Sequence, residues 1–347
     1  MILKQGLSGE EERLGKWDNV KLVLIFLVVL GHMGKKCMSD SGAIGRMVYF
    51  IYLFHMPCFV FVSGLFSKST VNQKRWNKIT SFVVMFYFMK ILNYMINFLV
   101  GKKPSFSIFN EYGIAWYMLS MALFMLITIA VRKYAFGVIM ALSILIGCLV
   151  GYDKSVGSFL TLSRVATFYP FFFLGYYLDI EKLTNFLRKK ALIIASAIWM
   201  IIVVGIVYQF YDKLQWSYAG FLKGVGNFDT QFKHSVWPEL VNYAWLVRLV
   251  YYALIIITII VVLALIPSVK CIFTRLGSRT IQVYALHETC MYLVFTVLGG
   301  GAWLMSFHPY VRLVIISILA LTFTLVLSTK YLSPFFQLLT GSSKKKE

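Results

Sequence analysis

The sequence predicts an all-α integral membrane protein with about ten transmembrane helices and both termini in the cytoplasm. Of its 347 residues, 59% are hydrophobic and 14% are charged, whereas soluble domains average about 45–50% apolar and about 25% charged residues. Apolar runs extend over the whole chain, and basic residues gather in the short segments between them. We therefore expect one membrane domain over residues 1–347.

The individual spans follow from the roughly 20 apolar residues that a membrane-crossing helix needs. The first is short and follows a charged segment, residues 1–19, which has no cleavable signal pattern and is expected to remain as a cytoplasmic tail. Only Arg132 and Lys133 separate the fourth span from the fifth. The predicted spans are residues 20–34, 46–67, 79–100, 113–131, 134–151, 158–178, 191–210, 244–266, 280–299 and 310–333.

The distribution of Lys and Arg agrees with this topology. With the N-terminus in the cytoplasm, the larger share of basic residues falls on the inner side, as the positive-inside rule requires. An even number of spans returns the C-terminus to that side, where residues 334–347 form a basic tail. The rule also explains the formal net charge of +20. Nucleic-acid binding is not needed to explain this charge, and the sequence has no aromatic-basic segment of the kind that binds RNA.

The longest segment between spans, residues 211–243, faces outward in this topology and is rich in Trp, Tyr, Phe and Gly. Long loops are usually functional or disordered, and the aromatic content argues against disorder. Stacking on sugar rings and placement at the membrane interface both remain open for its aromatic residues. The 5 cysteines show neither a CxxC pair nor zinc-ligand spacing, so we expect no disulfide and no metal site.

Ionisable residues inside the apolar segments are the main functional signal, because charges at membrane depth are costly. His32 follows Lys21 by 11 residues, which is about 16 Å along a helix. His55 precedes Pro57, which frees a backbone carbonyl one turn earlier. His287 lies beside Glu288. A single buried histidine is more often a hydrogen-bonded core residue, but three of them favour proton transfer near neutral pH.

Two further basic residues, Lys90 and Arg164, also lie within predicted spans. No GxSxG, Walker, HExxH or dinucleotide-binding glycine pattern accompanies them. Any chemistry at this depth is therefore expected to depend on histidine and not on a serine nucleophile.

The segment WDNVKLVLIFLVVLGH resembles the opening signature of the acyltransferase-3 family of membrane acyltransferases. That signature has an aspartate, a basic residue three positions later and a histidine after ten intervening residues; here these are Asp18, Lys21 and His32. Later motifs of the family follow in order over residues 13–335. They are FHMPCFVFVSGLFSK with His55 and Ser63, KRWNK with Arg75 and Lys78, WYMLSMALF with Trp116, SRVATFYPFFFLGYYL with Arg164, and GSRTIQVYALHE with His287.

The FHMP and FYPFFFLG elements are most similar to the fucose-acetylase-like and capsular-polysaccharide O-acetyltransferase branch. Three positions depart from the family pattern: Lys21 stands where Arg is commoner, Lys78 is the second basic residue of its pair, and Thr280 replaces a serine. Lysine keeps the charge of arginine but loses its bidentate geometry.

The resemblance implies a multi-pass protein of the bacterial inner or plasma membrane. It would move an acetyl group from acetyl-CoA, a co-substrate, to a hydroxyl of a surface polysaccharide or its lipid-linked precursor, without metal or nucleic acid. His32, Asp18 and Lys21 would be the catalytic residues, with His32 as the general base and Asp18 orienting Lys21 or the entry helix. Lys21, Arg75 and Lys78 would bind the phosphates of CoA, unless they only serve the positive-inside rule. His55, Ser63, Trp116, Arg164 and His287 would bind substrate or stabilise the oxyanion.

Two other classes of protein fit part of the pattern. A transporter or flippase of lipid-linked sugars would also have many spans with buried polar residues, but it would favour an internal repeat and broken helices. No repeat is visible and proline is scarce in the spans. A histidine-based membrane sensor would need a soluble signalling domain, which the composition does not indicate.

Overall fold

The computed structural model of the chain describes residues 2–38, 42–111 and 113–340, with side chains from residue 15 onward. Its regular structure there is helical, apart from a single β-bridge between Asn110 and Phe159. The α-helices are α1 (Ile2–Lys36), α2 (Gly42–Asn72), α3 (Trp76–Leu99), α4 (Trp116–Val131), α5 (Phe136–Leu149), α6 (Leu162–Tyr177), α7 (Ile180–Leu187), α8 (Lys190–Leu214), α9 (Trp216–Ala219), α10 (Phe228–Phe232), α11 (Ala244–Leu265), α12 (Thr280–Tyr292), α13 (Gly300–Met305), α14 (Pro309–Leu327) and α15 (Ser333–Leu339).

Six helical stretches of the described chain are long and apolar enough to cross a membrane. They are residues 15–36, 42–72, 76–99, 190–214, 238–265 and 309–327. This confirms an all-helical membrane protein with several spans. The ten predicted segments all coincide with helices, but four of these (α4, α5, α6 and α12) fall outside the set of six.

The four remaining helices differ from the six mainly in length. α4 has 16 residues and α5 has 14, and α12 ends after 13 residues, where a π-helix (Leu293–Val297) takes over. At 1.5 Å per residue such helices extend about 20–24 Å, which is less than the roughly 30 Å of a hydrocarbon core. Ten complete spans therefore stay a prediction.

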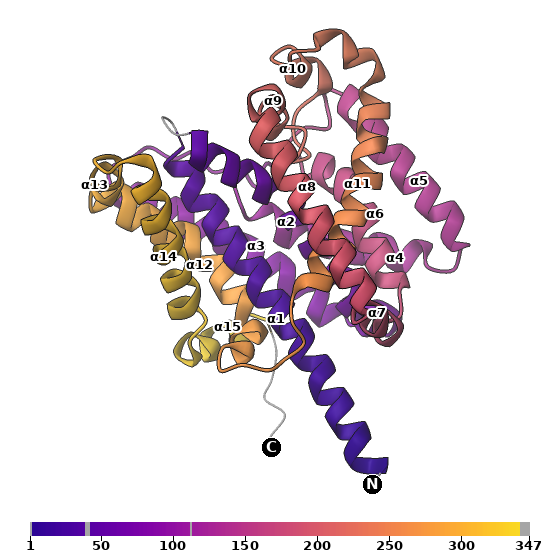
Figure 1. Cartoon of the computed structure of the whole chain (residues 1–347). Helices are drawn as coiled ribbons and strands as arrows, with labels where there is room; N and C mark the ends of the chain where they lie inside the picture. The colour runs from indigo at the N-terminus through magenta and orange to yellow at the C-terminus, as the bar shows by residue number, and fades with distance from the viewer. Residues whose placement is uncertain (1, 39–41, 112, 341–347) are drawn as a thin grey trace.

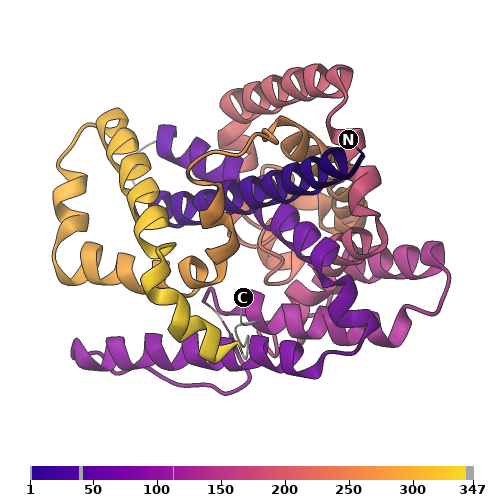
Figure 2. The same ribbon diagram turned by 90° about the horizontal axis from the view of Figure 1, so that it is seen from below.

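The helices are arranged between two ends of the molecule. Figure 1 shows the N-terminal part of α1 and α15 at the lower end, and α9 and α10 at the opposite end. Figure 2, seen from below, shows α1 inside the assembly with α14 beside it and α8 at the periphery. The predicted tail 1–19 is helical from Ile2. In the predicted C-terminal tail, α15 is described, whereas the basic run at 344–346 lies outside the described residues.

The core of the assembly is α2, which packs extensively against α1 and α6. Two glycines allow its close approach to α6. A methyl group on Gly64 would collide with the carbonyl oxygen of Phe172, and one on Gly175 with that of Phe61. Small residues at such contacts are a general device of membrane helix packing. They bring α2 and α6 together along the part of α2 that follows His55.

Pro57 lies inside α2, as the sequence requires, and leaves the carbonyl of Leu53 without its helical donor. The hydroxyl group of Tyr251 on α11 donates a hydrogen bond to this carbonyl at 3.3 Å. The break in the α2 hydrogen-bond ladder is thus satisfied by a neighbouring helix.

The predicted outward loop 211–243 is an ordered cap over the upper end. Its first four residues belong to α8, and the rest holds α9, α10 and the 3-10 helix η2 (Pro238–Tyr243). Its aromatic residues pack mainly on one another: Trp216 contacts Phe232, and Phe221 contacts Phe228, with ring centroids 4.6 and 6.1 Å apart. We call residues 215–243 the cap.

Candidate active site

Three histidines from α1, α2 and α12 lie close together below the cap. The ring of His32 is edge-on to that of His287, with 5.2 Å between centroids. Tyr52 stacks on His32 at 6.3 Å and contacts His55 at 4.7 Å. His32 and His55 line a cavity of about 280 Å³, together with Arg164, Lys223 and Glu288. We call it the histidine cavity.

The hydrogen bonds of two histidines define where their lone pairs lie. Nδ1 of His55 is 2.8 Å from the carbonyl oxygen of Ile51, and Nδ1 of His287 is 2.9 Å from that of Tyr284. Since a carbonyl oxygen only accepts, each Nδ1 donates, and each neutral ring keeps its lone pair on Nε2. Nε2 of His287 is buried and has no hydrogen-bond partner among the described residues.

His32 differs from the other two histidines, because its ring has no hydrogen bond to any residue that the structure describes. The protein therefore does not fix its tautomer, and either nitrogen is available to a substrate. A histidine that accepts a proton and later returns it needs this freedom.

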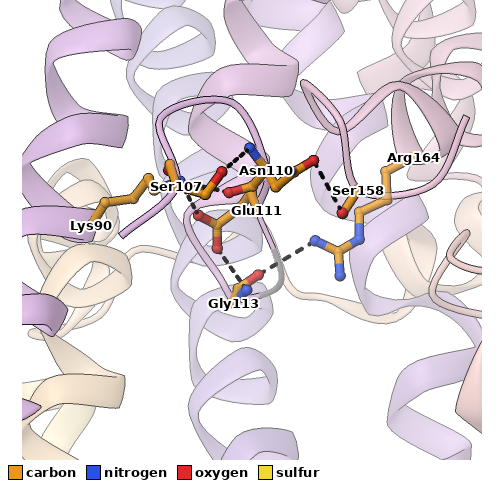
Figure 3. A network of polar contacts seen from close by, with 7 residues as sticks. All are labelled: Lys90, Ser107, Asn110, Glu111, Gly113, Ser158 and Arg164. Carbon is orange, nitrogen blue, oxygen red and sulfur yellow. Dashed lines mark hydrogen bonds and ion pairs between the residues drawn. The ribbon is translucent and has the colours of Figure 1, made fainter. Parts of the chain in front are cut away.

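Arg164 enters the histidine cavity from α6 and is held by neutral groups. Its guanidinium lies 4.9 Å from the ring centre of Trp116, which also lines the cavity, and donates to the carbonyl oxygen of Gly113 at 3.4 Å. The amide of Gly113 in turn donates to Glu111 at 2.6 Å. Figure 3 shows this turn of chain between Arg164 and Lys90.

Lys90, which the sequence marks as an intramembrane charge, holds the other side of the same turn. Its ammonium donates to the carbonyl oxygens of Ser107 and Asn110 at 2.6 and 2.7 Å, and lies 3.5 Å from Glu111. These contacts position the backbone that orients Arg164, so Lys90 acts at a distance from the cavity.

Asp18 and Lys21 form an ion pair of 2.6 Å on α1. Lys21 lines a second cavity of about 280 Å³, together with Ser63, Lys78 and Tyr284. We call it the middle cavity. Along α1, Lys21 and His32 are about 16 Å apart, so the two conspicuous polar positions of this helix serve different cavities.

Arg75 and Lys78 line a third and larger cavity of about 680 Å³, which we call the basic cavity. Lys78 lines both the basic and the middle cavity, and Tyr284 lines both the middle and the histidine cavity. The three cavities therefore follow one another. The structure brings Lys21, Arg75 and Lys78 to one part of this series and the histidines to the other.

Ser63 lies at the boundary and not beside the histidines. Its hydroxyl donates to the carbonyl oxygen of Phe59 at 2.8 Å and accepts from Tyr117 at 2.6 Å. The Tyr117 ring contacts that of Tyr284 at 5.2 Å, and the Tyr284 hydroxyl donates to Ile114 at 2.5 Å. These two tyrosines form the wall between the middle and histidine cavities.

Several residues of the site carry no signal in the sequence. Lys223 comes from the cap, Lys35 from the end of α1, and Tyr52 from an aromatic-rich stretch of α2; all three line the histidine cavity. Glu111 sits in a polar segment where a carboxylate is ordinary. The conspicuous neighbour of His287, Glu288, is the carboxylate of this cavity.

Comparison with known proteins gives one match. A family model, Acyl_transf_3, described as an acyltransferase domain, matches residues 14–329. This range contains all the residues that line the histidine and middle cavities. No curated protein and no solved structure matches the chain.

Proposed function

Because the chain belongs to the acyltransferase-3 family and is a membrane acyltransferase, we propose that it transfers an acetyl group from acetyl-CoA to a hydroxyl of a surface polysaccharide or of its lipid-linked precursor. The observation that carries this proposal is the series of cavities, which has a basic group of residues on one side and, on the other, His32 and His55 in the lining with His287 packed against His32. The enzyme assignment also removes the reason to prefer a transporter.

Acetyl-CoA fits the basic side of the series. Its phosphates need donors with positive charge, and Arg75 and Lys78 offer these in the basic cavity, followed by Lys21 in the middle cavity. Asp18 holds the Lys21 ammonium at 2.6 Å and so orients it. The acetyl thioester would then extend through the middle cavity toward Tyr284 and His32. This side faces the cytoplasm of a bacterial cell in the proposal.

His32 is the proposed general base for the acceptor hydroxyl. Its imidazole takes the hydroxyl proton while the hydroxyl oxygen attacks the thioester carbonyl carbon, and a tetrahedral oxyanion forms. When this intermediate collapses, the carbon–sulfur bond breaks and the imidazolium returns the proton to the CoA sulfur. Positioned proton transfer of this kind contributes about 10²–10⁴ in rate.

The other cavity residues supply binding and charge. Arg164 is the proposed donor to the oxyanion, because its guanidinium already lies in the cavity and is held on Trp116 and Gly113. Nε2 of neutral His55 carries a lone pair inside the cavity and suits a hydrogen bond from a substrate hydroxyl. His287 is buried against His32 and does not line the cavity, so in the proposal it orients substrate through His32. Ser63 acts through Tyr117 at the wall that the thioester has to pass.

The test compares surface glycans from cells that produce the intact protein or the His32→Ala variant at equal membrane abundance. Proton NMR of the purified polysaccharide would show O-acetyl methyl signals that mild base removes, and these should be lost in the variant. His308→Ala is the matched control, since His308 is exposed and lines none of the three cavities. Unchanged acetylation in His32→Ala would refute the proposed base.

A further inference from the structure

The histidine cavity has an excess of positive charge that the acetyl donor does not explain. Three basic side chains line it: Lys35 at the end of α1, Arg164 on α6 and Lys223 in the cap. Glu288 is the one carboxylate in the lining. The phosphates of CoA already have Lys21, Arg75 and Lys78 on the other side of the Tyr117–Tyr284 wall.

No carboxylate of the described chain forms an ion pair with any of the three cations; Glu288 interacts with Lys35, and Glu111 with Arg164, only over longer distances. The carboxylates of Asp18, Glu111 and Asp229 pair instead with Lys21, Lys90 and Lys154. Arg164 contacts a backbone carbonyl and the Trp116 ring instead. The Lys223 ammonium lies over the Tyr218 ring, 3.9 Å from its centroid, and 5.7 Å from that of Tyr52.

The charges also act on one another. Burial, and next the positive charges of Lys35 and Arg164, lower the pKa of Lys223 to about 8. Like charges that share a site disfavour each other's charged form, and the single carboxylate in the lining, Glu288, offsets only one of the three positive charges. An anionic ligand would relieve this repulsion and restore the full charge of Lys223.

The backbone of Lys223 is held firmly on both sides. The carbonyl oxygen of Phe221 accepts from the buried guanidinium of Arg248 at 2.7 Å, and that of Gly224 accepts from Ser163 at 2.9 Å. Gly224 has φ +64°, a conformation that favours glycine. Groups fixed in this way lose little conformational entropy when they bind a ligand. The cap therefore holds Lys223 at the cavity in a position that is set before any ligand binds.

We infer that the acceptor is an anionic glycan, whose carboxylate or phosphate binds Lys223 and Lys35 while a neighbouring hydroxyl lies against His32. The inference rests on the proposed function and adds the substrate class of the same cavity. A neutral sugar needs hydroxyl partners only, and would leave the excess positive charge around buried Arg164, half-buried Lys223 and exposed Lys35 uncompensated. Lys223 is thus a specificity residue, distinct from the base and from the donor site.

The experiment uses the purified full-length protein in lipid nanodiscs with radiolabelled acetyl-CoA. The acceptor is the de-O-acetylated surface glycan of the producing cells in four forms: untreated, carboxyl-reduced, dephosphorylated with hydrogen fluoride, and treated both ways. The readout is base-labile label in the glycan. We expect at least about a tenfold loss of transfer after one of the two treatments, and the treatment that causes it identifies the anion.

Equal transfer to the untreated and doubly treated glycans would overturn the anionic acceptor while leaving the proposed function intact. Absence of transfer to every form would overturn the proposed function itself, and the inference with it.

Variants separate Lys223 from a structural role. Lys223→Gln should raise KM for the charged glycan about tenfold, with kcat and the KM for acetyl-CoA unchanged, and Lys223→Arg should restore KM. Lys233→Gln is the matched control, because Lys233 is an exposed lysine of the same cap. An unchanged KM in Lys223→Gln would overturn the assignment of this residue.

Discussion

The imidazoles of His32 and His287 lie edge to face with 5.2 Å between their centroids, although they come from the first and the twelfth helix of the chain. His287 is fixed by two backbone carbonyls and buries an Nε2 atom without a partner in the described chain. His32 has no such constraint. The pair therefore combines one rigid ring with one that is free to exchange protons.

We predict that His32 and His287 act as a unit. His32→Ala should lower kcat about 10²–10⁴-fold, His287→Ala should lower it less, and the double variant should resemble His32→Ala because residues in one network are not additive. Acetyl transfer by the purified variants measures this. If the two single losses multiply in the double variant, the histidines act independently.

The sequence identified the histidines because polar residues inside apolar runs are costly and therefore conspicuous. The same criterion marked Lys90, which the structure places on the backbone carbonyls of Ser107 and Asn110 and outside the histidine cavity. An apolar segment alone does not show whether its polar residue lines the site or binds backbone elsewhere. For Lys90 the answer depends on partners that lie 17 and 20 residues further along the chain.

Lys223 shows the converse limit. It lies in a polar segment where a lysine is unremarkable, and its position depends on how Arg248 and Ser163 hold the cap. The outward placement of the loop predicted at 211–243 stays a prediction, and the sequence left open the role of its aromatic residues, which pack on one another in the structure. The positions of the ten long apolar segments were predictable, whereas the short helices between them were not, and helix lengths, and so the number of complete spans, depend on where packing ends each helix.

The second prediction concerns the donor. If Arg75 and Lys78 bind the phosphates of CoA, the intact enzyme should use acetyl-CoA far better than acetyl-pantetheine, which has no phosphate. Arg75→Gln with Lys78→Gln should raise KM for acetyl-CoA and abolish this preference, because the charge-assisted contacts are gone. Initial rates over both donors test it.

Lys74→Gln is the control for that experiment, since Lys74 is an exposed neighbour outside the three cavities. If the double variant kept the full preference for acetyl-CoA over acetyl-pantetheine, the phosphates of CoA would bind at other residues than Arg75 and Lys78.

The third prediction concerns the contact between α2 and α6. Gly64→Ala should lower the free energy of unfolding by about 1–3 kcal/mol, the usual cost of overpacking, because its methyl group would meet the backbone of Phe172. Gly175→Ala should behave alike. Thermal unfolding in detergent measures the loss. Gly205→Ala on α8 is the control, as nothing lies within 4 Å of the added methyl group, and an equal effect there would contradict the packing argument.

The last prediction concerns pH. A lysine is charged below its pKa, so with the pKa of Lys223 at about 8 the free enzyme loses this charge as the pH rises through that value. Since kcat/KM reports the free enzyme, we expect kcat/KM for the anionic glycan to fall above about pH 8. The other titratable or charged groups of this cavity are His32, Lys35, Tyr52, His55, Arg164, Tyr284 and Glu288; Tyr218 packs on Lys223.

Deprotonation of a histidine base at high pH preserves its activity, so it does not produce this fall. Tyr218 does not produce it either, because burial raises the pKa of Tyr218 to about 12. Lys223→Arg should abolish the fall up to about pH 9.5, since a guanidinium stays charged there, and Lys223→Gln should give a low profile that is flat above neutral pH. A fall at the same pH in Lys223→Gln would assign it to another group and remove Lys223 from acceptor binding.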